Sequence, residues 1–334
     1  MHDRSALSSL ARTGRTDVTH DCWNIPEHAP KALFASLSLA IGGAVVALFR
    51  IRHTTTYRYR EPVYLGPHRL QLRPRESRDI RLREAAIEVS PNAGITWAFD
   101  VFGNAIATAF FTEPTDLLVV ESKIALDHDA PAWPLFDVAV SATSYPFQYD
   151  PGECTDLGAL LQPQHPDTDD RILNWARDFV RSDPTDTLSL LKDINAGIGA
   201  WVSYQAREDE GTQSPLESLD RRYGSCRDIA VLFIEAARHL GFGARIVSGY
   251  LANRAEDGPE SSYAGTTHAW AEIYLPGAGW ITFDPTNRTI GTFCLIPVAV
   301  ARDIRQAVPV SGSFTGASDA FVSMNVDVEI QVTL

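Results

Sequence analysis

The stretch RRYGSCRDIAVLFIEAARHLGFGAR, residues 221–245, decides the fold of the second half of the chain. Gly224 and Ser225 are turn residues, and an apolar stripe then repeats at helical spacing until Gly241. The stripe consists of Ile229, Phe233, Ala236, Ala237 and Leu240. The pattern therefore predicts a helix with Cys226 at its N-terminus.

A cysteine at that position has a chemical consequence. The first backbone N–H groups of a helix have no intrahelical acceptor, and together with the helix dipole they stabilise a thiolate. The same N–H groups can receive the oxyanion of a tetrahedral intermediate. From position alone, Cys226 is either a nucleophile or a small buried hydrophobic residue at a helix start.

A second motif lies about 40 residues further on, in THAWAEIYLPGAGWITFDPTNR, residues 267–288. It predicts a β-hairpin that turns at residues 276–279. Alternation places His268 on one face of the first strand and Asp284 on one face of the second, near each other on a diagonal. If the two faces coincide, Asp284 can hydrogen-bond His268 and stabilise the imidazolium that a thiolate partner requires.

The first half of the chain has a different pattern. From Ile51, apolar and polar residues alternate with period two, and further short alternating runs follow up to Leu126 between Gly, Pro, Asn and Asp turns. This spacing predicts a β-sandwich of about 100 residues. Residues 172–180 and 188–202 repeat at helical spacing instead, which predicts two amphipathic helices ahead of Cys226.

These patterns divide the chain into an N-terminal extension (1–50), a β-rich domain (51–145), a linker rich in Pro, Asp and Gln (146–168), and a catalytic core with C-terminal strands (169–334). The length of 334 residues agrees with two domains. Residues 32–49 form an apolar run without charge, long enough for a marginal membrane span or an export signal. The alternatives are a buried helix or a start assigned upstream of the true domain.

Charge and cysteine usage exclude several classes of function. A formal net charge of −13 argues against a nucleic-acid binder, because phosphate neutralisation requires clustered Lys and Arg. Cys22, Cys154, Cys226 and Cys294 show neither CxxC spacing nor nearby paired histidines, so we expect no structural zinc and no disulfide framework. As a separate expectation, no metal or organic cofactor is required. We expect a cytoplasmic protein, with a membrane anchor or export as the alternative if residues 32–49 act as one.

The segments YGSCRDIAVLFIEAARHLGFGARIVSGYL, HAWAEIYLPGAGW and FDPTN resemble the bacterial transglutaminase-like proteins, often described as candidate cysteine proteases. IRHTTTYRYREPVYLGPHRLQLRPR is similar to the opening of that family's β-rich N-terminal domain. The resemblance implies an α+β fold in which a β-sandwich precedes a papain-like core of helices packed on an antiparallel sheet. It also implies that Cys226 is the nucleophile, His268 the general base and then acid, and Asp284 the orienting residue.

The resulting hypothesis is acyl transfer on a peptide or carboxamide bond through a thioester, with a peptide or protein as substrate. Water would make the enzyme a protease or amidase and an amine would make it a transglutaminase, and we favour hydrolysis. The alternative is a non-catalytic papain-like module that docks peptides or a protein partner. The sequence leaves the oligomeric state open.

Three neighbouring residues have a structural and a functional interpretation each. Asp228 can cap the helix start or support the site, and capping is favoured. Tyr204 can donate a second hydrogen bond to the oxyanion or pack in the core. Trp270 can line a substrate channel, although aromatic strand residues usually belong to the core.

Overall fold

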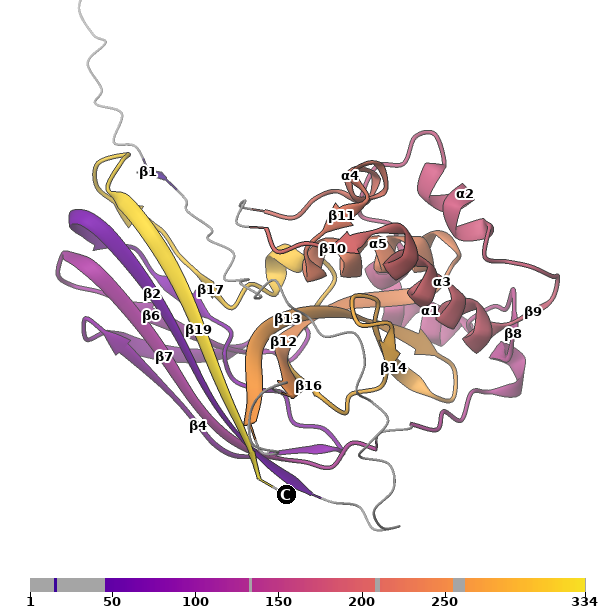
Figure 1. The fold of residues 1–334 in the computed structure, drawn as a ribbon, viewed down its shortest axis with the longest axis horizontal. Helices are drawn as coiled ribbons and strands as arrows, with labels where there is room; N and C mark the ends of the chain where they lie inside the picture. Colours follow the sequence, from indigo (N-terminus) through magenta and orange to yellow (C-terminus); the bar gives the residue numbers. More distant parts are fainter. Residues whose placement is uncertain (1–14, 17–45, 132–133, 208–210, 255–261, 334) are drawn as a thin grey trace, which may run out of the picture.

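The computed structural model describes residues 15–16, 46–131, 134–207, 211–254 and 262–333. Its strands form one large sheet that crosses both halves of the chain, a smaller sheet packed on it, and a group of helices that covers the far end of the large sheet (Figure 1). The chain is therefore β-rich at its beginning and of mixed α+β architecture in its second half.

The large sheet has 11 strands in the central order β1-β18-β2-β19-β13-β12-β16, with β7 and β4 extending from β2, and β14 and β15 from β13. Its strands are β1 (Arg15–Thr16), β2 (Ala47–Leu65), β4 (Ile80–Ser90), β7 (Thr115–His128), β12 (Gly243–Arg254), β13 (Ser262–Leu275), β14 (Gly279–Asp284), β15 (Thr289–Ile290), β16 (Leu295–Ala301), β18 (Phe314–Thr315) and β19 (Phe321–Thr333).

The smaller sheet has the order β17-β3-β6-β5 and packs against β2 and β7 through a shared apolar cluster that includes Tyr57, Leu70 and Leu118. Its strands are β3 (His68–Leu70), β5 (Gly94–Phe99), β6 (Ala105–Phe110) and β17 (Val310–Ser311). Two short ladders join β8 (Ser144–Tyr145) to β9 (Thr185–Asp186), and β10 (Ser203–Tyr204) to β11 (Tyr223–Gly224).

The alternation at the start of β2 has the predicted effect on burial. Ile51, His53 and Thr55 are buried, while Arg52 and Arg58 are exposed. A strand with one apolar face must bury that face against a second layer. The buried face of β2 packs against residues of the smaller sheet and of β12 and β16.

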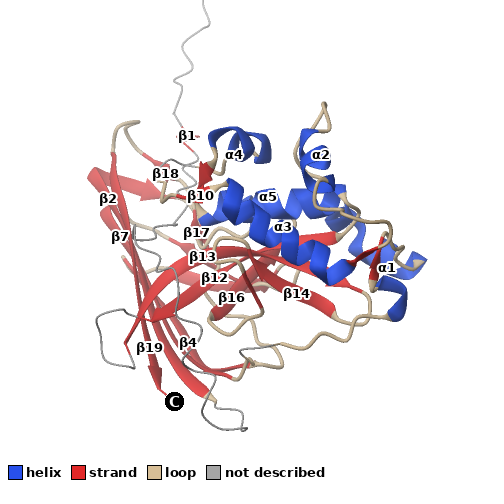
Figure 2. Cartoon of the chain, turned by 45° about the vertical axis from the view of Figure 1, so that its right-hand side comes forward, coloured by secondary structure: helices blue, strands red, loops and turns tan. Residues whose placement is uncertain are grey.

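Helices cover one face of β12, β13 and β14 (Figure 2). They are α1 (Pro151–Leu157), α2 (Arg171–Arg177), α3 (Thr187–Trp201), α4 (Pro215–Arg221) and α5 (Cys226–His239), and 3₁₀ turns occupy Val140–Ala142, Gly158–Leu161 and Ile304–Gln306. α5 starts and ends as predicted, with Gly241 in the left-handed conformation (φ 90°) after its C-terminus.

α5 is buried on all sides, so the apolar stripe read from the sequence understates its burial. Every residue from Cys226 to Arg238 is buried, including four charged ones. Glu235 and Arg238 form an ion pair of 2.9 Å, and Glu235 also accepts the backbone N–H groups of Gln164 and His165. A buried charge is tolerated only when it is paired and hydrogen-bonded, and both conditions hold here.

The structure differs from the sequence-based predictions at three places. The segment predicted as a linker contains α1, which begins with Pro151 after a capping box between Asp150 and Glu153. The strand expected to start at Ile51 starts at Ala47. A self-contained N-terminal β-sandwich is not confirmed, because β19 pairs with β2 along its length and β17 pairs with β3.

Most of the apolar run 32–49 lies outside the described residues, and its last three residues, 47–49, belong to β2. Within the described ranges, none of the helices has the length and apolar character needed to cross a bilayer.

Candidate active site

The hairpin of β13 and β14 brings His268 and Asp284 together. Its register pairs Glu272 with Thr282 and Tyr274 with Trp280, so the two faces identified from alternation are the same face. Nε2 of His268 lies 2.8 Å from Oδ2 of Asp284, and the two side chains are each about 1% exposed. Sequence alternation therefore predicted the correct neighbours.

Asp284 is held by the turn that follows it. Its Oδ1 accepts the backbone N–H groups of Thr286 (3.1 Å) and Asn287 (3.3 Å), and its Oδ2 accepts the side-chain amide of Asn287 (2.7 Å). An aspartate that bonds the backbone two residues ahead is the usual start of such a turn. Asn287 was not among the site residues predicted from the sequence, although the DPTN turn carried that signal.

The two charges of this pair shift each other's protonation. Burial alone would lower the pKa of His268, but the Asp284 carboxylate and the nearby Cys226 thiol outweigh burial and raise that pKa above its ordinary value. Burial would raise the pKa of Asp284, but the imidazolium and the hydrogen bonds from Asn287 lower it below its ordinary value. The pair is therefore an imidazolium–carboxylate ion pair at neutral pH.

α5 presents Cys226 as its first residue, with Ser225 as the N-cap. The turn before the helix is fixed by Asp228, whose Oδ2 accepts both the backbone N–H and the hydroxyl of Ser225, each at 2.8 Å. Oδ1 of Asp228 accepts the backbone N–H of Gln213 at 2.7 Å, and Arg207 forms an ion pair with the carboxylate at 2.9 Å. Asp228 thus has the capping role that the sequence favoured, and it also anchors the segment that leads into the helix.

The cysteine and the histidine come from different layers and meet where α5 packs on β13. The thiol of Cys226 lies near the imidazole and, after Asp284, contributes to raising its pKa. Because Nε2 is engaged by Asp284, the ring nitrogen available to the thiol is Nδ1, which is buried and has no hydrogen-bond partner, sulfur included, within the described ranges. The three residues singled out from the sequence therefore lie in the order thiol, imidazole, carboxylate.

The ring of Trp270 packs against the imidazole of His268. Its ring is fully buried and stacks on His268 with 6.0 Å between ring centroids. Gly249, opposite His268 in β12, allows this packing, since a Cβ there would lie 2.1 Å from the carbonyl oxygen of Ile296 and 2.8 Å from the Trp270 ring. Trp270 is a core residue that restricts the imidazole, and it does not line a channel.

Tyr204 lies beside the cysteine, because β10 pairs with β11 and sets Tyr204 opposite Gly224. Burial, and after it the charge on Cys226, raise the pKa of Tyr204. Its hydroxyl therefore stays protonated at neutral pH and is available as a hydrogen-bond donor.

Comparisons with known proteins agree with this arrangement. Residues 49–127 match the family described as the bacterial transglutaminase-like N-terminal region. Residues 173–285, a range that contains Cys226, His268 and Asp284, match the transglutaminase-like superfamily.

Two relatives and one solved structure are similar over most of their length. An uncharacterized protein of Mycobacterium tuberculosis is 28% identical over 306 residues, covering 88% of this chain and 96% of that protein. An uncharacterized protein of Mycobacterium leprae is 22% identical over 289 residues, covering 85% and 98%. The crystal structure of a candidate cysteine protease from Cytophaga hutchinsonii is 21% identical, with a TM-score of 0.66, and covers 86% of this chain and 98% of its own, which shows a common fold. The chain therefore belongs to the bacterial transglutaminase-like proteins, with the family's N-terminal region at residues 49–127 and a transglutaminase-like core at residues 173–285.

Proposed function

We propose that this protein is a cysteine-dependent acyl-transfer enzyme that acts on peptide or carboxamide bonds, with hydrolysis as its principal outcome. The observation that carries the proposal is the arrangement around His268. Asp284 binds Nε2 at 2.8 Å, which leaves Nδ1 for the thiol of Cys226 at the N-terminus of α5. A thiol, a base and an orienting group within contact of one another are the requirements for nucleophilic catalysis.

The chemistry proceeds in two stages. The Cys226 thiolate attacks the carbonyl carbon and forms a C–S bond, and the C–N bond of the amide breaks as Nδ1 of His268 gives its proton to the leaving amine. A water molecule then attacks the thioester while the neutral imidazole takes its proton, and the C–S bond breaks to release the acid and to regenerate the thiolate–imidazolium pair. Asp284 keeps the imidazole oriented and stabilises its charged form in both stages.

The negative oxygen of each tetrahedral intermediate needs hydrogen-bond donors. The backbone N–H groups of Cys226 and Arg227, in the first turn of α5, have no intrahelical acceptors and are the first donors in this proposal. The neutral hydroxyl of Tyr204 is the second donor in this proposal, since it is the phenol that senses the charge on Cys226.

One observation favours hydrolysis over amine transfer: the solved structure that shares this fold is named as a candidate protease. The Cytophaga hutchinsonii protein is named a candidate cysteine protease, and we transfer that activity class to this chain as part of the proposal. The proposed substrates are therefore peptides or proteins.

The test uses casein with a dansylated primary amine as a competing acceptor, followed by mass spectrometry of the products. We expect new peptide termini that disappear in Cys226→Ala and persist in the matched control Cys154→Ala, which removes an exposed thiol. If dansyl incorporation depends on Cys226, the thioester part of the proposal stands, but the reaction is amine transfer and not hydrolysis. Absence of both products would contradict acyl transfer and favour a non-catalytic binding module.

A further inference from the structure

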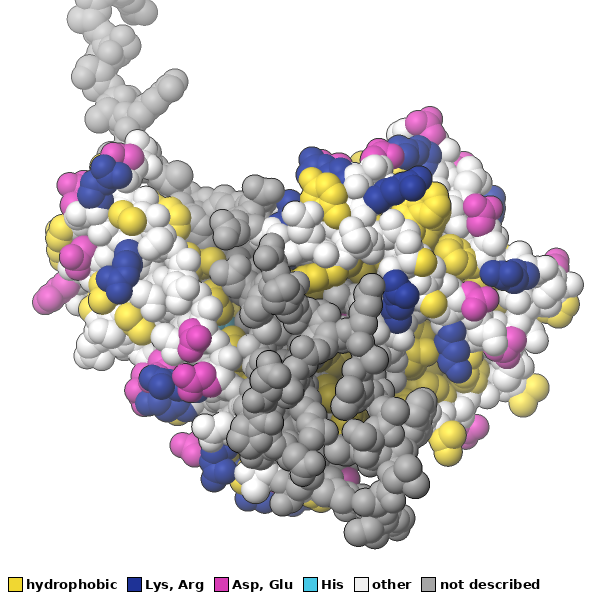
Figure 3. Space-filling view, viewed as in Figure 1, with side chains coloured by type: hydrophobic (Ala, Val, Ile, Leu, Met, Phe, Trp, Pro, Cys, Tyr) yellow, Lys and Arg dark blue, Asp and Glu magenta, His cyan; other side chains and the backbone are white. Residues whose placement is uncertain are grey.

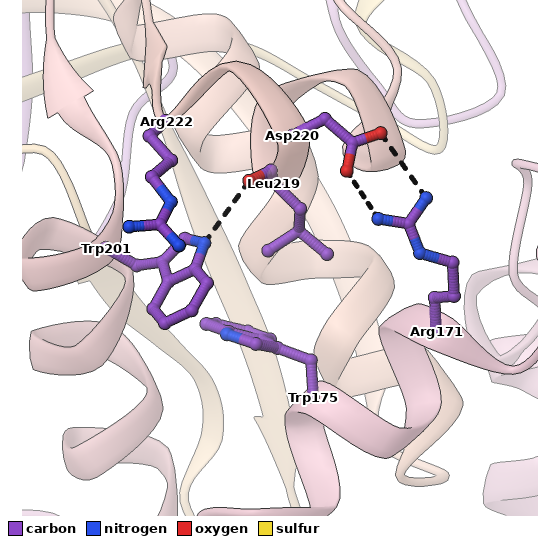
Figure 4. Close-up of a pocket in the computed structure, with 6 residues that line it drawn as sticks. All are labelled: Arg171, Trp175, Trp201, Leu219, Asp220 and Arg222. Atoms are coloured by element: carbon purple, nitrogen blue, oxygen red, sulfur yellow. Dashed lines mark hydrogen bonds and ion pairs between the residues drawn. The ribbon is translucent and has the colours of Figure 1, made fainter.

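A concave site lies on the helical side of the molecule, between α2, the C-terminal end of α3, and α4 (Figure 4). The cavity has a volume of about 340 Å³, which is within the range of small-molecule and side-chain sites. It is lined by Arg171, Trp175, Trp201, Leu219, Asp220 and Arg222. Figure 3 shows basic and apolar side chains next to each other over α2 and α4.

The apolar walls of the cavity are two indole rings and a leucine. Nε1 of Trp201 donates to the backbone oxygen of Leu219 at 3.3 Å, which fixes the plane of that ring. Trp175 packs edge-on against Phe179, with 5.0 Å between ring centroids, and projects from α2 toward the cavity. Rigid aromatic walls of this kind favour a flat apolar group over a flexible chain.

The charges around the cavity are not balanced. Arg171 and Asp220 are paired with each other through two hydrogen bonds. The guanidinium of Arg222 stacks on the Trp201 ring, 4.4 Å from its centroid, and makes no hydrogen bond or ion pair to any of the described residues. The cavity thus carries one available positive charge, in a chain whose net charge is −13.

The backbone at Arg222 is also unusual. Arg222 is the C-cap of α4 and has φ 58° and ψ 21°, a left-handed conformation that glycine adopts more easily than any other residue. An arginine here therefore costs backbone stability, which the stack on Trp201 and the negative end of the α4 dipole offset in part. Strain held at a concave surface, together with a guanidinium that pairs with no anion among the described residues, points to a ligand.

We propose that this cavity binds an aromatic side chain that has a carboxylate next to it, with the ring between the two indoles and the carboxylate on Arg222. Guanidinium recognises carboxylate through paired N–H donors and tolerates an aromatic face below it. Two sources supply this chemistry: an aromatic residue at a free peptide C-terminus, and an aromatic residue beside Asp or Glu within a chain.

The position of the cavity relates it to Cys226, and in this respect the inference rests on the proposed function. Arg222 precedes Cys226 by four residues, so their Cα atoms are at most about 14 Å apart. Trp201 leads into β10 and Arg222 into β11, the two strands that lie beside the cysteine. A peptide of four or five extended residues spans that distance, so the cavity would select substrates by a side chain remote from the bond that reacts.

The test measures binding to the Cys226→Ala protein by calorimetry, so that its result does not depend on catalysis. The probes are N-acetyl-phenylalanine, N-acetyl-phenylalaninamide, N-acetyl-glycine and the amidated dipeptide N-acetyl-Phe-Glu-amide, each titrated into the millimolar range. We expect N-acetyl-phenylalanine or the dipeptide to bind. N-acetyl-glycine, which lacks the ring, and N-acetyl-phenylalaninamide, which lacks the charge, should bind at least about tenfold more weakly, the loss expected for one charge-assisted pair. Which of the two binds identifies the source.

The decisive variant is Arg222→Gly, with Arg221→Ala as its control. Arg221 is the adjacent residue, pairs with Glu217 and does not line the cavity. We expect Arg222→Gly to abolish binding while its melting temperature stays equal or rises, because glycine relieves the left-handed strain, and we expect the control to bind normally. Absence of binding by all four probes, or binding that survives in both Arg222→Gly and Trp175→Ala, would overturn the inference and leave acyl transfer at Cys226 unaffected.

Discussion

His268 binds the Asp284 carboxylate through Nε2 and keeps Nδ1 available to the Cys226 thiol, and this residue determines how the site responds to pH. Its pKa is raised by Asp284 and Cys226, and the pKa of Asp284 is lowered in return. A histidine with a raised pKa stabilises the fold fully below its unfolded value, and that stabilisation is lost as the pH rises through the folded value. For an aspartate with a lowered pKa, the stabilisation is present above the unfolded value and is lost as the pH falls through the folded value.

Asp284→Asn therefore has a pH-dependent cost. The difference in the free energy of unfolding between wild type and variant should be largest from about pH 4 to pH 6.5, the interval between the unfolded pKa values of the two groups, and should shrink as the pH rises further. We expect about 3 kcal/mol at the maximum, because the change leaves a buried charge without its partner. Urea titrations at several pH values measure this difference, and Asp116→Asn, on an exposed part of β7, is the control. An equal cost at pH 5 and at a strongly alkaline pH would contradict the ion pair.

Tyr204→Phe tests the second oxyanion donor. The substitution removes one hydroxyl and keeps the ring that packs beside β11, so we expect the melting temperature to change little. The rate constant kcat should fall by about 100-fold, the usual effect of losing one donor, while KM stays similar. Steady-state kinetics on a peptide cleaved by the wild type measures both. Unchanged kcat would restrict Tyr204 to packing.

At the scale of the element, α5 holds Cys226 in place through its own first turn. Asp228 accepts three hydrogen bonds from Ser225 and Gln213 and forms an ion pair with Arg207. Gly224 allows the carboxylate to approach, since a Cβ at that position would lie 2.9 Å from the Cβ of Asp228.

Asp228→Ala should therefore destabilise the protein by about 3–5 kcal/mol, the cost of leaving a buried arginine without its partner. Chemical denaturation measures the change, and Asp220→Ala, which breaks an exposed pair, should cost less than about 1 kcal/mol. If the two variants were equally stable, the network around Asp228 would not be what fixes the start of α5.

The elements around the site differ in how well the sequence predicted them. Helical periodicity predicted α5 with its correct start and end, because that signal is local. Alternation placed His268 and Asp284 near each other on a diagonal, and only the register of the hairpin shows that their two faces coincide. Burial of Glu235 and Arg238 could not be read from the sequence, since their partners come from residues 160–165 and 244 and from Arg302. Helix α1 was missed because it is short and lies in a Pro-rich segment, although the Asp150–Glu153 capping box indicated it.

At the scale of the whole molecule, the two halves of the chain share one sheet. β19, at the C-terminus, pairs with β2 along its length and also with the start of β13, the strand that carries His268. No local signal predicts the pairing of β19 with β2, because it joins residues more than 250 positions apart. Ile330 and Val332 of β19 are buried in one apolar cluster with residues of β2, β7, β12 and β16, so this part of the core is shared by both halves of the chain.

This architecture predicts a single unfolding transition. Differential scanning calorimetry of the whole chain should give one peak whose calorimetric and van't Hoff enthalpies agree, as for one cooperative unit. Truncation before Phe321 should lower the melting temperature of the entire protein. Two separate transitions in the whole chain would contradict a shared sheet. An unchanged melting temperature of the transglutaminase-like core in the truncated protein would contradict it as well.

The most direct test of the central claim is the rate of alkylation by iodoacetamide at pH 6, resolved for each cysteine by mass spectrometry in wild type and His268→Ala. Cys154 is exposed and Cys294 has a pKa raised to about 11 by burial, so the same sample contains two reference thiols. If Cys226 is a thiolate paired with imidazolium, it should react much faster than exposed Cys154 despite its burial, and His268→Ala should remove that advantage while leaving Cys154 unchanged. A Cys226 that reacts more slowly than Cys154, or at a rate indifferent to His268, would contradict the assembled thiol–imidazole–carboxylate site.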